Sequence, residues 1–399
     1  MERGSKNGLT VCYFGTYSMG EGYPVNRVLI EGLRRAGATV WECRVGLWDV
    51  AGDPGASKWN APRRLTGRLR LAAAWALAWG RLAWRWATGP PADVVIVGYL
   101  GHVDVLLARL LTRRPVVLNA LLSLHDTLVD DRRLVAPGSA LARAIRGLDR
   151  LACRAADLVF LDTRAHIDYF ASEFGLPPER FHRVFVGSDR AAVPSSSHPP
   201  RPPVGAVQHA PCRALFVGTF IPLHGTGTIV AAAERLRGAE PPIEVRLIGR
   251  GQEFEATAEA VARLNLTRVE LVGRWVGREE LARELADADV CLGVFGGSEK
   301  ARRVIPSKVF DALAAGKPVI TADTPAAREL LTHGEDAWLC PPADPDALAA
   351  GLLALARDPA LRARLAAGAR RTFAARCAPE AIGREVRGIL EGLVRPTAP

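Results

Sequence analysis

The chain has 399 residues, of which 49% are hydrophobic and 24% charged, a composition that excludes a disordered protein and allows two domains with their own cores. Seven scattered cysteines without a C-x-x-C pair argue against a disulfide framework and against a zinc site. The net charge is +10, and residues 51–150 alone hold 15 Lys and Arg against 7 Asp and Glu, which predicts a basic surface in the N-terminal half.

Two further features bear on where the protein works. The chain begins with MERGSKNGLTVCYFG and passes directly into an apolar run, without the signal segment of a secreted protein. No window reaches the roughly 18 apolar residues of a membrane span. We therefore expect a cytoplasmic protein with reduced thiols. Because no nucleic-acid-binding motif accompanies the basic excess, nucleic acid is not an expected partner.

Short apolar runs alternate with longer amphipathic segments through the first half of the chain. The runs cover 9–15, 38–45, 93–100, 115–122, 157–163 and 183–187. Such alternation is typical of βαβ units around a parallel sheet. Residues 1–192 are therefore predicted to form an N-terminal Rossmann-like domain.

A Pro- and Ser-rich stretch, VPSSSHPPRPPVGAVQHAP at 193–211, interrupts this alternation and is interpreted as an interdomain linker. After it the pattern resumes, with apolar runs at 214–218, 244–249, 269–273, 289–295, 318–322 and 337–342. A second Rossmann-like domain is predicted over 212–380, followed by a helix over 381–399 that returns to the first domain. The fold class is α/β, with two doubly wound domains and ligands expected at the carboxyl ends of the strands.

A Gly-rich segment after the first strand is one candidate functional feature. Gly15, Gly20 and Gly22 would let the backbone come close to a ligand or acceptor in a cleft. An ordinary turn explains the same glycines equally well.

The segment 63–89 is a second candidate, because a helical wheel separates its tryptophans from its arginines. The two faces hold Trp75, Trp79 and Trp86, and Arg70, Arg81 and Arg85. Trp and Arg on an amphipathic helix suit the headgroup boundary of an anionic membrane, which would make the protein peripheral on the inner face of the cell membrane. Packing of the Trp face against the sheet is the equally supported alternative.

Lysine is rare in this chain, with five Lys among 52 basic residues. Lys300, Lys308 and Lys317 fall within 18 residues around the stretch VIPSKVFDALAAGKPVI. A Lys kept in an Arg-rich chain suggests a compact point charge facing an anion, with chance on a solvated face as the alternative. Ser307 opens the predicted helix, so Lys300 and Lys308 flank N–H groups that attract anions. Lys317 lies near the opposite end, where complementing a helix C-terminus is favoured.

Several motifs follow one another in a characteristic order. They are LSLHDT at 122–127, FVGSD at 185–189, LFVGTFIPLHG at 215–225, LIGRG at 247–251, VGRW at 272–275, DVCLGVFG at 289–296 and IPSKVFDALAAGKPVI at 305–320. This series resembles family 4 of the group 1 retaining glycosyltransferases, which have the GT-B fold of two Rossmann-like domains facing each other across a cleft. The resemblance implies transfer of a sugar from a nucleotide-diphosphate sugar to a glycan, lipid or small-molecule acceptor, with no cofactor and no obligatory metal.

The resemblance also implies roles for individual residues. His125 would position the sugar and stabilise developing charge while the donor phosphate accepts the proton of the acceptor, although a lone His is more often structural. Lys300 and Lys308 would hold the diphosphate. Asp311 replaces a Glu that accepts hydrogen bonds from ribose hydroxyls, with support of the helix dipole as the alternative. The residues expected to bind the donor are Gly218, Thr219, His224, Gly249, Trp275, Glu299, Arg303, Ile305, Pro306 and Asp311.

Two departures from the family pattern change the charge of the expected site. Position 303 usually carries an acid that meets the sugar hydroxyls and here is Arg303, for which Glu299 is a candidate substitute. The loop that usually carries Arg and Lys has Thr219 and His224 instead. The phosphate charge is then expected to be met by Lys300, Arg302, Arg303 and Lys308.

Other interpretations of the same motifs remain open. A GT-B nucleotide-sugar epimerase would need acid and base carboxylates in the cleft, and a phosphorylase of this fold would need a cofactor Lys. A degenerate, non-catalytic nucleotide-sugar-binding protein is suggested by Arg303, Thr219 and His224.

Overall fold

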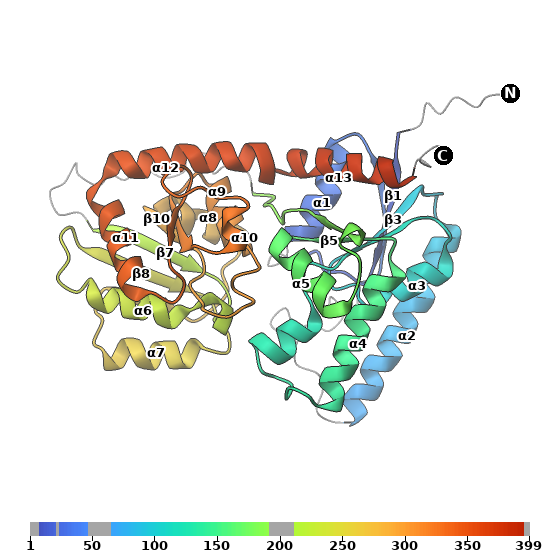
Figure 1. The fold of residues 1–399 in the computed structure, drawn as a ribbon, viewed down its shortest axis with the longest axis horizontal. Coiled ribbons are helices and arrows are strands. Elements are labelled where there is room, and N and C mark those ends of the chain that lie inside the picture. The colour runs from blue at the N-terminus through green and yellow to red at the C-terminus, as the bar shows by residue number, and fades with distance from the viewer. Residues whose placement is uncertain (1–7, 21–23, 47–64, 191–210, 395–399) are drawn as a thin grey trace. The chain divides into compact units, whose positions relative to one another are not determined.

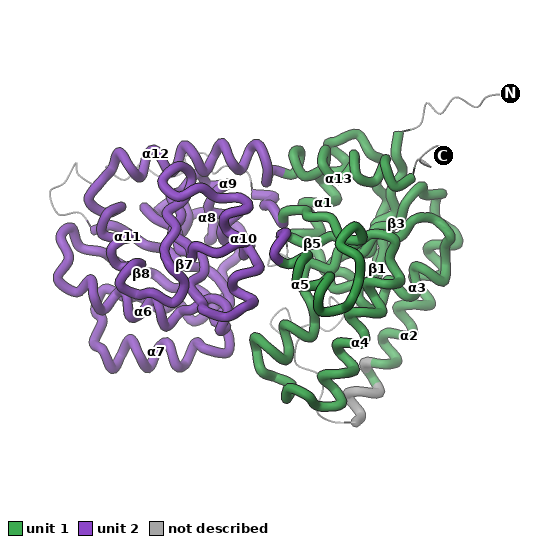
Figure 2. Tube along the Cα trace, in the orientation of Figure 1, with its two compact units in different colours: residues 1–162, 166–185, 379–399 green, residues 163–165, 186–378 purple. Residues whose placement is uncertain are grey.

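The computed structural model describes residues 8–20, 24–46, 65–190 and 211–394 (Figure 1). Gly22 and all but the last residue of the predicted linker at 193–211 lie outside these ranges. The chain divides into two compact units (Figure 2). Unit 1 consists of residues 1–162, 166–185 and 379–399, and unit 2 of residues 163–165 and 186–378. Within the described ranges, no helix is both long and apolar enough to cross a membrane.

Unit 1 is built on a six-stranded parallel sheet in the order β2-β1-β3-β4-β5-β6. The strands are β1 (Thr10–Gly15), β2 (Thr39–Arg44), β3 (Val94–Val97), β4 (Val116–Asn119), β5 (Leu158–Leu161) and β6 (Phe181–Arg183). β3, β4 and β5 are buried along their whole length, as expected for parallel strands covered on both faces.

Two groups of helices cover the two faces of this sheet. One hydrophobic cluster joins the sheet to α1 (Pro24–Arg35) and α13 (Pro379–Val394). The other joins it to α2 (Leu65–Thr88), α3 (Asp104–Leu111), α4 (Ala140–Ala155) and α5 (Arg164–Phe174). Each face of the sheet therefore has its own core, which is the arrangement of a doubly wound domain.

Unit 2 repeats this architecture, with the sheet order β12-β11-β10-β7-β8-β9. Its strands are β7 (Cys212–Val217), β8 (Ile243–Ile248), β9 (Val269–Val272), β10 (Val290–Leu292), β11 (Val319–Ala322) and β12 (Trp338–Cys340). Its helices are α6 (Thr226–Arg235), α7 (Phe254–Arg263), α8 (Arg278–Asp287), α9 (Ser307–Ala314), α10 (Pro325–Arg328), α11 (Pro345–Arg357) and α12 (Pro359–Thr372). One large cluster of buried side chains fills the core.

The apolar runs of the sequence coincide with these strands, with one displacement. β6 ends at Arg183, where the predicted run at 183–187 begins. Val184 still donates its N–H to Leu161 O at 2.7 Å, but Gly187 adopts φ 66° and turns the chain away from the sheet. The residues after Arg183 are therefore buried without forming a strand.

The last helix packs on the first through two glycines. A Cβ atom added to Gly383 would lie 1.9 Å from Gly32 O, and one added to Gly32 would lie 2.3 Å from Pro379 O. The helices α1 and α13 can approach this closely only because both residues lack a side chain. The approach lets Ile382 and Val386 of α13 enter the same core as β1, where both are fully buried.

We expect Gly383→Ala to destabilise unit 1, because the added methyl group must push two packed helices apart. The cost should be about 1–3 kcal/mol, the usual range for overpacking. Gly388→Ala on the same helix is the matched control, since a Cβ atom there has no neighbour within 4 Å. It should raise stability slightly, because Ala favours a helix over Gly by about 1 kcal/mol. Urea unfolding of both variants measures the difference, and equal shifts would contradict the close crossing.

Candidate functional site

The strand order of unit 2 reverses between β7 and β10, which are hydrogen-bonded neighbours. The connection after β7 leads toward β8 on one side, and that after β10 leads toward β11 on the other. In open α/β sheets, ligands bind outside the carboxyl ends of the strands at such a reversal. The segments at this point are 218–225 after β7 and 293–306 after β10, and both were singled out by the sequence.

The two segments are held together by direct backbone contact. Phe295 donates its N–H to His224 O at 3.1 Å. Gly225 has φ 63°, and a Cβ atom on it would lie 2.5 Å from Gly296 N. The adjoining side chains Ile221 and Ala301 are buried in one small cluster. The glycines therefore serve close approach between the two segments.

Lys308 crosses from α9 to the end of β7. Its Nζ lies 4.5 Å from the centroid of the Phe216 ring, within cation–π range. A Cβ atom on Gly218 would lie 2.8 Å from Lys308 Cε and 2.9 Å from Nζ, so Gly218 provides the space that the ammonium occupies. Burial lowers the pKa of Lys308 well below its ordinary value, and Asp311 partly opposes this effect. The site thus holds a desolvated lysine amine, whose charged form burial disfavours, at the strand-order reversal.

Residues of the neighbouring segments pack around the amine of Lys308. His224 is buried, its Nδ1 contacts Thr219 O, and its ring packs edge-to-face on Phe216 at 5.7 Å. Gly249 after β8 has φ 139°, and a Cβ atom there would lie 1.9 Å from Gly218 O. The structure therefore brings His224, Gly218 and Gly249 together beside Lys308.

Asp311 lies one turn after Lys308 on the same helix. Its Oδ1 accepts hydrogen bonds from Ser188 Oγ at 2.7 Å and from Arg190 Nε at 3.1 Å. Burial raises the pKa of Asp311, while Arg190 and Ser188 oppose the shift. Sequence reasoning missed Ser188 and Arg190, although they flank the last residue of the FVGSD motif, Asp189.

The other residues predicted to bind the donor differ in how far they are buried. Ile305 is buried and Pro306 precedes the first residue of α9. Glu299 is exposed, accepts from Arg303 Nε at its backbone oxygen at 3.0 Å, and lies 4.0 Å from Arg302. Trp275 is 52% exposed after β9, two strands away from β7.

The three lysines of the cluster have different surroundings. Lys300 is almost fully buried, with a relative exposure of 6%. Lys317 Nζ donates to Ala286 O at 2.6 Å and to Ala288 O at 2.9 Å. It therefore complements a helix C-terminus, as expected, but that of α8 and not that of α9, the helix that precedes it in the chain.

Unit 1 contains a corresponding position between β1 and β3, where its strand order reverses. Asp104 in the first turn of α3 accepts from Thr16 N at 2.7 Å and from Trp79 Nε1 at 3.1 Å. Gly15 has φ 127°, and a Cβ atom on it would lie 2.8 Å from Asp104 Oδ2. Gly20 is exposed and donates its N–H to Ser18 Oγ at 3.2 Å. Of the three predicted loop glycines, the described part therefore shows a structural requirement for Gly15.

His125 immediately precedes a turn of π-helix at Asp126–Asp131. Its backbone N–H donates to Asp149 Oδ2 at 2.9 Å, and Ser123 Oγ donates to the same oxygen at 2.7 Å. Asp149 on α4 is fully buried, so it fixes the segment that carries His125. The His125 ring lies 3.5 Å from Asp130 through Nδ1 and Oδ2.

The helix predicted within 63–89 is α2, and its tryptophans do not act as one face. Trp79 and Trp86 pack against the core, and Trp86 stacks on Trp41 at 6.0 Å. The packed alternative is therefore correct for these two residues. The opposite side of α2 exposes Leu77 and Trp84, by 64% and 67%. The wheel missed this exposed pair, which lies among the exposed arginines Arg70, Arg81 and Arg85.

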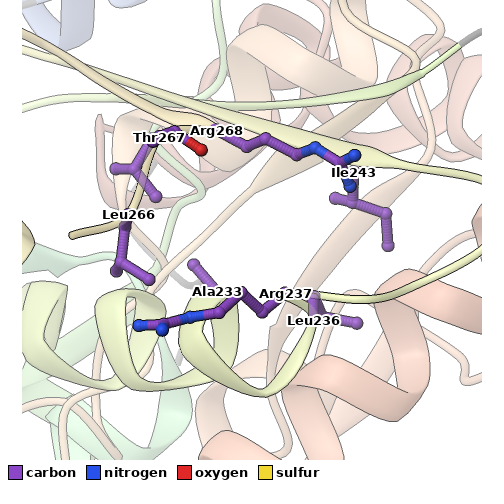
Figure 3. A pocket seen from close by; sticks show the side chains of 8 residues that line it. Ala233, Leu236, Arg237, Ile243, Leu266, Thr267 and Arg268 are labelled. Atoms are coloured by element: carbon purple, nitrogen blue, oxygen red, sulfur yellow. The ribbon is translucent and has the colours of Figure 1, made fainter. Parts of the chain in front are cut away.

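Metal ligands and a cavity are two further features that bear on the site. In the described parts of the chain, no three His, Cys, Asp or Glu side chains lie close enough together to hold a metal ion. A cavity of about 130 Å³ in unit 2 is lined by residues including Leu236, Arg237, Ile243 and Arg268 (Figure 3). It lies where β8 and β9 begin, whereas Lys308 lies at the carboxyl ends of the strands. The cavity therefore does not belong to the candidate site.

Comparison with known proteins shows which families and structures these features are similar to. Residues 211–358 match the family described as glycosyl transferases group 1. The chain is 32% identical over 154 residues to amylovoran biosynthesis glycosyltransferase AmsK of Erwinia amylovora, a match covering 38% of each chain. It is 28% identical over 194 residues to phosphatidyl-myo-inositol mannosyltransferase of Mycolicibacterium smegmatis, covering 46% of this chain and 47% of that relative. The chain thus matches less than half the length of these relatives.

Solved structures share the fold over nearly the whole chain. HepE of Anabaena in complex with UDP has a TM-score of 0.65 at 16% identity, covering 96% of this chain and 100% of that one. Sucrose-phosphate synthase of Thermosynechococcus elongatus has a TM-score of 0.65 at 18% identity, covering 96% and 99%. The predicted fold class, two Rossmann-like doubly wound domains of the GT-B type, is confirmed.

The environment of Lys308 can be measured directly because the chain has only five lysines. With ¹³C-labelled lysine, NMR should resolve few Cε signals, and Lys308 should titrate well below an ordinary lysine because burial disfavours its charged form. Gly218→Ala should raise the pKa of Lys308, since the added methyl group displaces the ammonium toward water. Gly227→Ala is the control, because a Cβ atom there has no neighbour within 4 Å. An unchanged Lys308 titration in Gly218→Ala would contradict the packing.

Proposed function

We propose, from the match of residues 211–358 to the group 1 glycosyl transferases, that the protein transfers a sugar from a nucleotide-diphosphate sugar to a glycan, lipid or small-molecule acceptor. The observation that carries this proposal is the buried amine of Lys308, which lies over the Phe216 ring at the strand-order reversal of unit 2 and whose charge an anionic ligand would stabilise. Its ammonium has lost the water that stabilises its charge. A diphosphate at this position would replace that water and be held in turn.

The surrounding groups suit the other parts of such a donor. The first N–H groups of α9 have no partner within the helix, so they favour an anion beside Lys308. Gly218 and Gly249 leave the backbone accessible at close range. Asp311 supplies a carboxylate for the ribose hydroxyls. HepE was solved with UDP and with UDP-glucose, which makes a uridine diphosphate sugar the first donor to test.

The reaction we propose retains the configuration at the sugar, as the motif series implies. The bond between the sugar and the phosphate oxygen breaks, the acceptor oxygen bonds to the same carbon, and the acceptor proton passes to the departing phosphate. Lys308 stabilises the negative charge that develops on that phosphate. We propose that His125 positions the sugar, the role that the resemblance implies. The named activities of AmsK and of the phosphatidyl-myo-inositol mannosyltransferase support a glycan or lipid acceptor.

Release of sugar from a panel of UDP-, GDP- and ADP-sugars tests this function, with product analysis to separate transfer from epimerisation and phosphorolysis. Binding of a nucleoside diphosphate without turnover of any donor, with acceptors supplied, would favour a non-catalytic binding protein. Failure of UDP, GDP and ADP to bind at millimolar concentration would overturn the proposal.

Substitutions of two lysines test the assigned charge. Lys308→Ala should lower kcat by roughly 10²–10³, the scale for losing one preorganised stabilising group. Lys308→Arg should recover only part of this loss, because the planar guanidinium does not fit the space left by Gly218. Lys317→Arg is the control and should be nearly silent, since Lys317 bonds two carbonyl oxygens at the end of α8. Full activity of Lys308→Arg would show that the diphosphate is held elsewhere.

We also propose that unit 1 binds an anionic lipid surface peripherally, through the exposed side of α2. Leu77 and Trp84 can enter the headgroup boundary, and the exposed Arg81 beside them can meet lipid phosphates. The neighbouring helix α3 exposes Leu110 by 81% and is followed by Arg113. The basic excess of residues 51–150 has the sign that such a surface requires.

Co-sedimentation with mixed phosphatidylglycerol and phosphatidylcholine vesicles measures this binding. Trp84→Ser should lower the partition coefficient about tenfold or more, since burying a large apolar side chain contributes about 1.5–3 kcal/mol. Trp275→Ser, which removes an exposed tryptophan of unit 2, is the matched control and should bind vesicles like the parent. Binding should weaken as salt rises. Equal binding of parent and Trp84→Ser would exclude this side of α2.

A further inference from the structure

The carboxylate of Asp311 is engaged on only one of its two oxygens. Ser188 Oγ donates to Oδ1 at 2.7 Å, and Arg190 Nε donates to the same atom at 3.1 Å. Among the described residues, no hydrogen bond to Oδ2 accompanies them. The side chain of Asp311 is 14% exposed, so a ligand can reach it while most of the group is shielded from water.

The two donors belong to a short segment, 187–190, that is itself firmly held. Gly187 turns the chain with φ 66°, and Ser188 is fully buried. Ser188 Oγ also accepts from Arg190 N at 3.2 Å, so one hydroxyl links the segment to Asp311. Arg278 of α8 donates to Asp189 O at 2.7 Å and pairs with the Asp189 carboxylate at 3.2 Å. The segment therefore has a fixed geometry relative to α8 and α9.

We propose that Ser188 and Arg190 are positioning residues that hold Oδ1 of Asp311 so that Oδ2 is presented to the ribose hydroxyls of the donor nucleotide. The inference rests on the proposed function and adds to it the residues that set recognition of ribose. A carboxylate on a short Asp side chain can rotate, and two donors on one oxygen fix that rotation. The remaining oxygen can then accept from one or both ribose hydroxyls.

Arg190 has a second effect, on the charge of the carboxylate. The charged or titratable groups that face Asp311 are Arg190 and Asp189 from the 187–190 segment, Lys308 on its own helix, and Cys291 of β10. Arg190 lowers the pKa of Asp311, against the effect of burial and of Asp189. A carboxylate kept ionised accepts hydrogen bonds from two hydroxyls, whereas a protonated one loses part of this capacity.

The test compares ribose with deoxyribose. The probes are whichever of UDP, GDP and ADP binds the parent most tightly, together with its 2′-deoxy and 3′-deoxy analogues, measured by calorimetry. The variants are Ser188→Ala, Arg190→Gln, Arg190→Lys and Asp311→Asn, with the double variant of Arg190→Gln and Asp311→Asn. Arg278→Gln is the matched control, because it loosens the 187–190 segment without removing a contact to Asp311.

In the parent, at least one deoxy analogue should bind about tenfold more weakly than the ribonucleotide, because a hydrogen bond to a charged group is lost. Arg190→Gln and Ser188→Ala should reduce this ratio severalfold while the affinity for the deoxy analogue changes little. Arg190→Lys should restore part of the ratio. The preference for ribose should be lost below a certain pH, at which Asp311 becomes protonated. Arg190→Gln should raise this pH, because the pKa of Asp311 rises without the guanidinium. In Asp311→Asn, adding Arg190→Gln should have no further effect.

Three results would overturn the inference while leaving the proposed function intact. They are a parent that binds the nucleotide without preferring ribose, an Arg190→Gln variant that keeps the full preference, and equal weakening of ribo- and deoxyribonucleotides by Arg190→Gln. An Arg278→Gln variant that loses the preference as strongly would assign it to the rigidity of the segment and not to the two donors. If none of the three diphosphates binds the parent, the proposed function fails first, and the inference fails with it.

Discussion

The candidate site of unit 2 depends on a lysine amine, that of Lys308, held away from water. Lys308 extends from the first turn of α9 over the ring of Phe216, into space that exists because residue 218 is glycine. The aromatic ring offsets only part of the lost hydration, so burial still lowers the pKa of the ammonium. The backbone contact between the segments after β7 and β10 serves this arrangement, because it fixes the strand end on which Phe216 lies relative to the helix that carries Lys308.

Unit 1 has a similar arrangement at its own strand-order reversal, with an acidic residue in place of the lysine. At its strand-order reversal, Asp104 in the first turn of α3 reaches the glycine that ends β1, as Lys308 reaches the glycine after β7. The carboxylate of Asp104 is satisfied by Thr16 and Trp79, so it fixes the loop after Gly15 from within the protein. The two units therefore share one arrangement, in which an ionisable residue in the first turn of the helix after the neighbouring strand lies against a glycine at the end of the first strand. Only in unit 2 does its charge suit an anionic ligand.

Sequence reasoning reached the features that are encoded locally. The apolar runs predicted the strands because the spacing of apolar residues is visible within a few neighbouring positions. The motif around Lys308 and Asp311 likewise predicted the start of one helix. The contact between Arg190 and Asp311 joins residues 121 positions apart and depends on the turn at Gly187, so no local pattern could indicate it. The helical wheel of α2 put Trp75, Trp79 and Trp86 on one face, but it left out Trp84, which lies among the arginines, and it could not show which side packs. Trp79 is turned inward by its bond to Asp104, and Trp84 is left outside.

The crossing of α1 and α13 also has a consequence for the order of folding during synthesis. Ile382, Val386 and Leu390 belong to the core around β1, yet the ribosome adds them after every residue of unit 2. Domains usually fold in the order in which they leave the ribosome. Here unit 2 is the first to have its complete sequence available, and the nascent unit 1 must keep an unfilled apolar face through about half of translation. The apolar side chains of α1 and β1 that pack against α13 are thus without this partner until α13 has been synthesised.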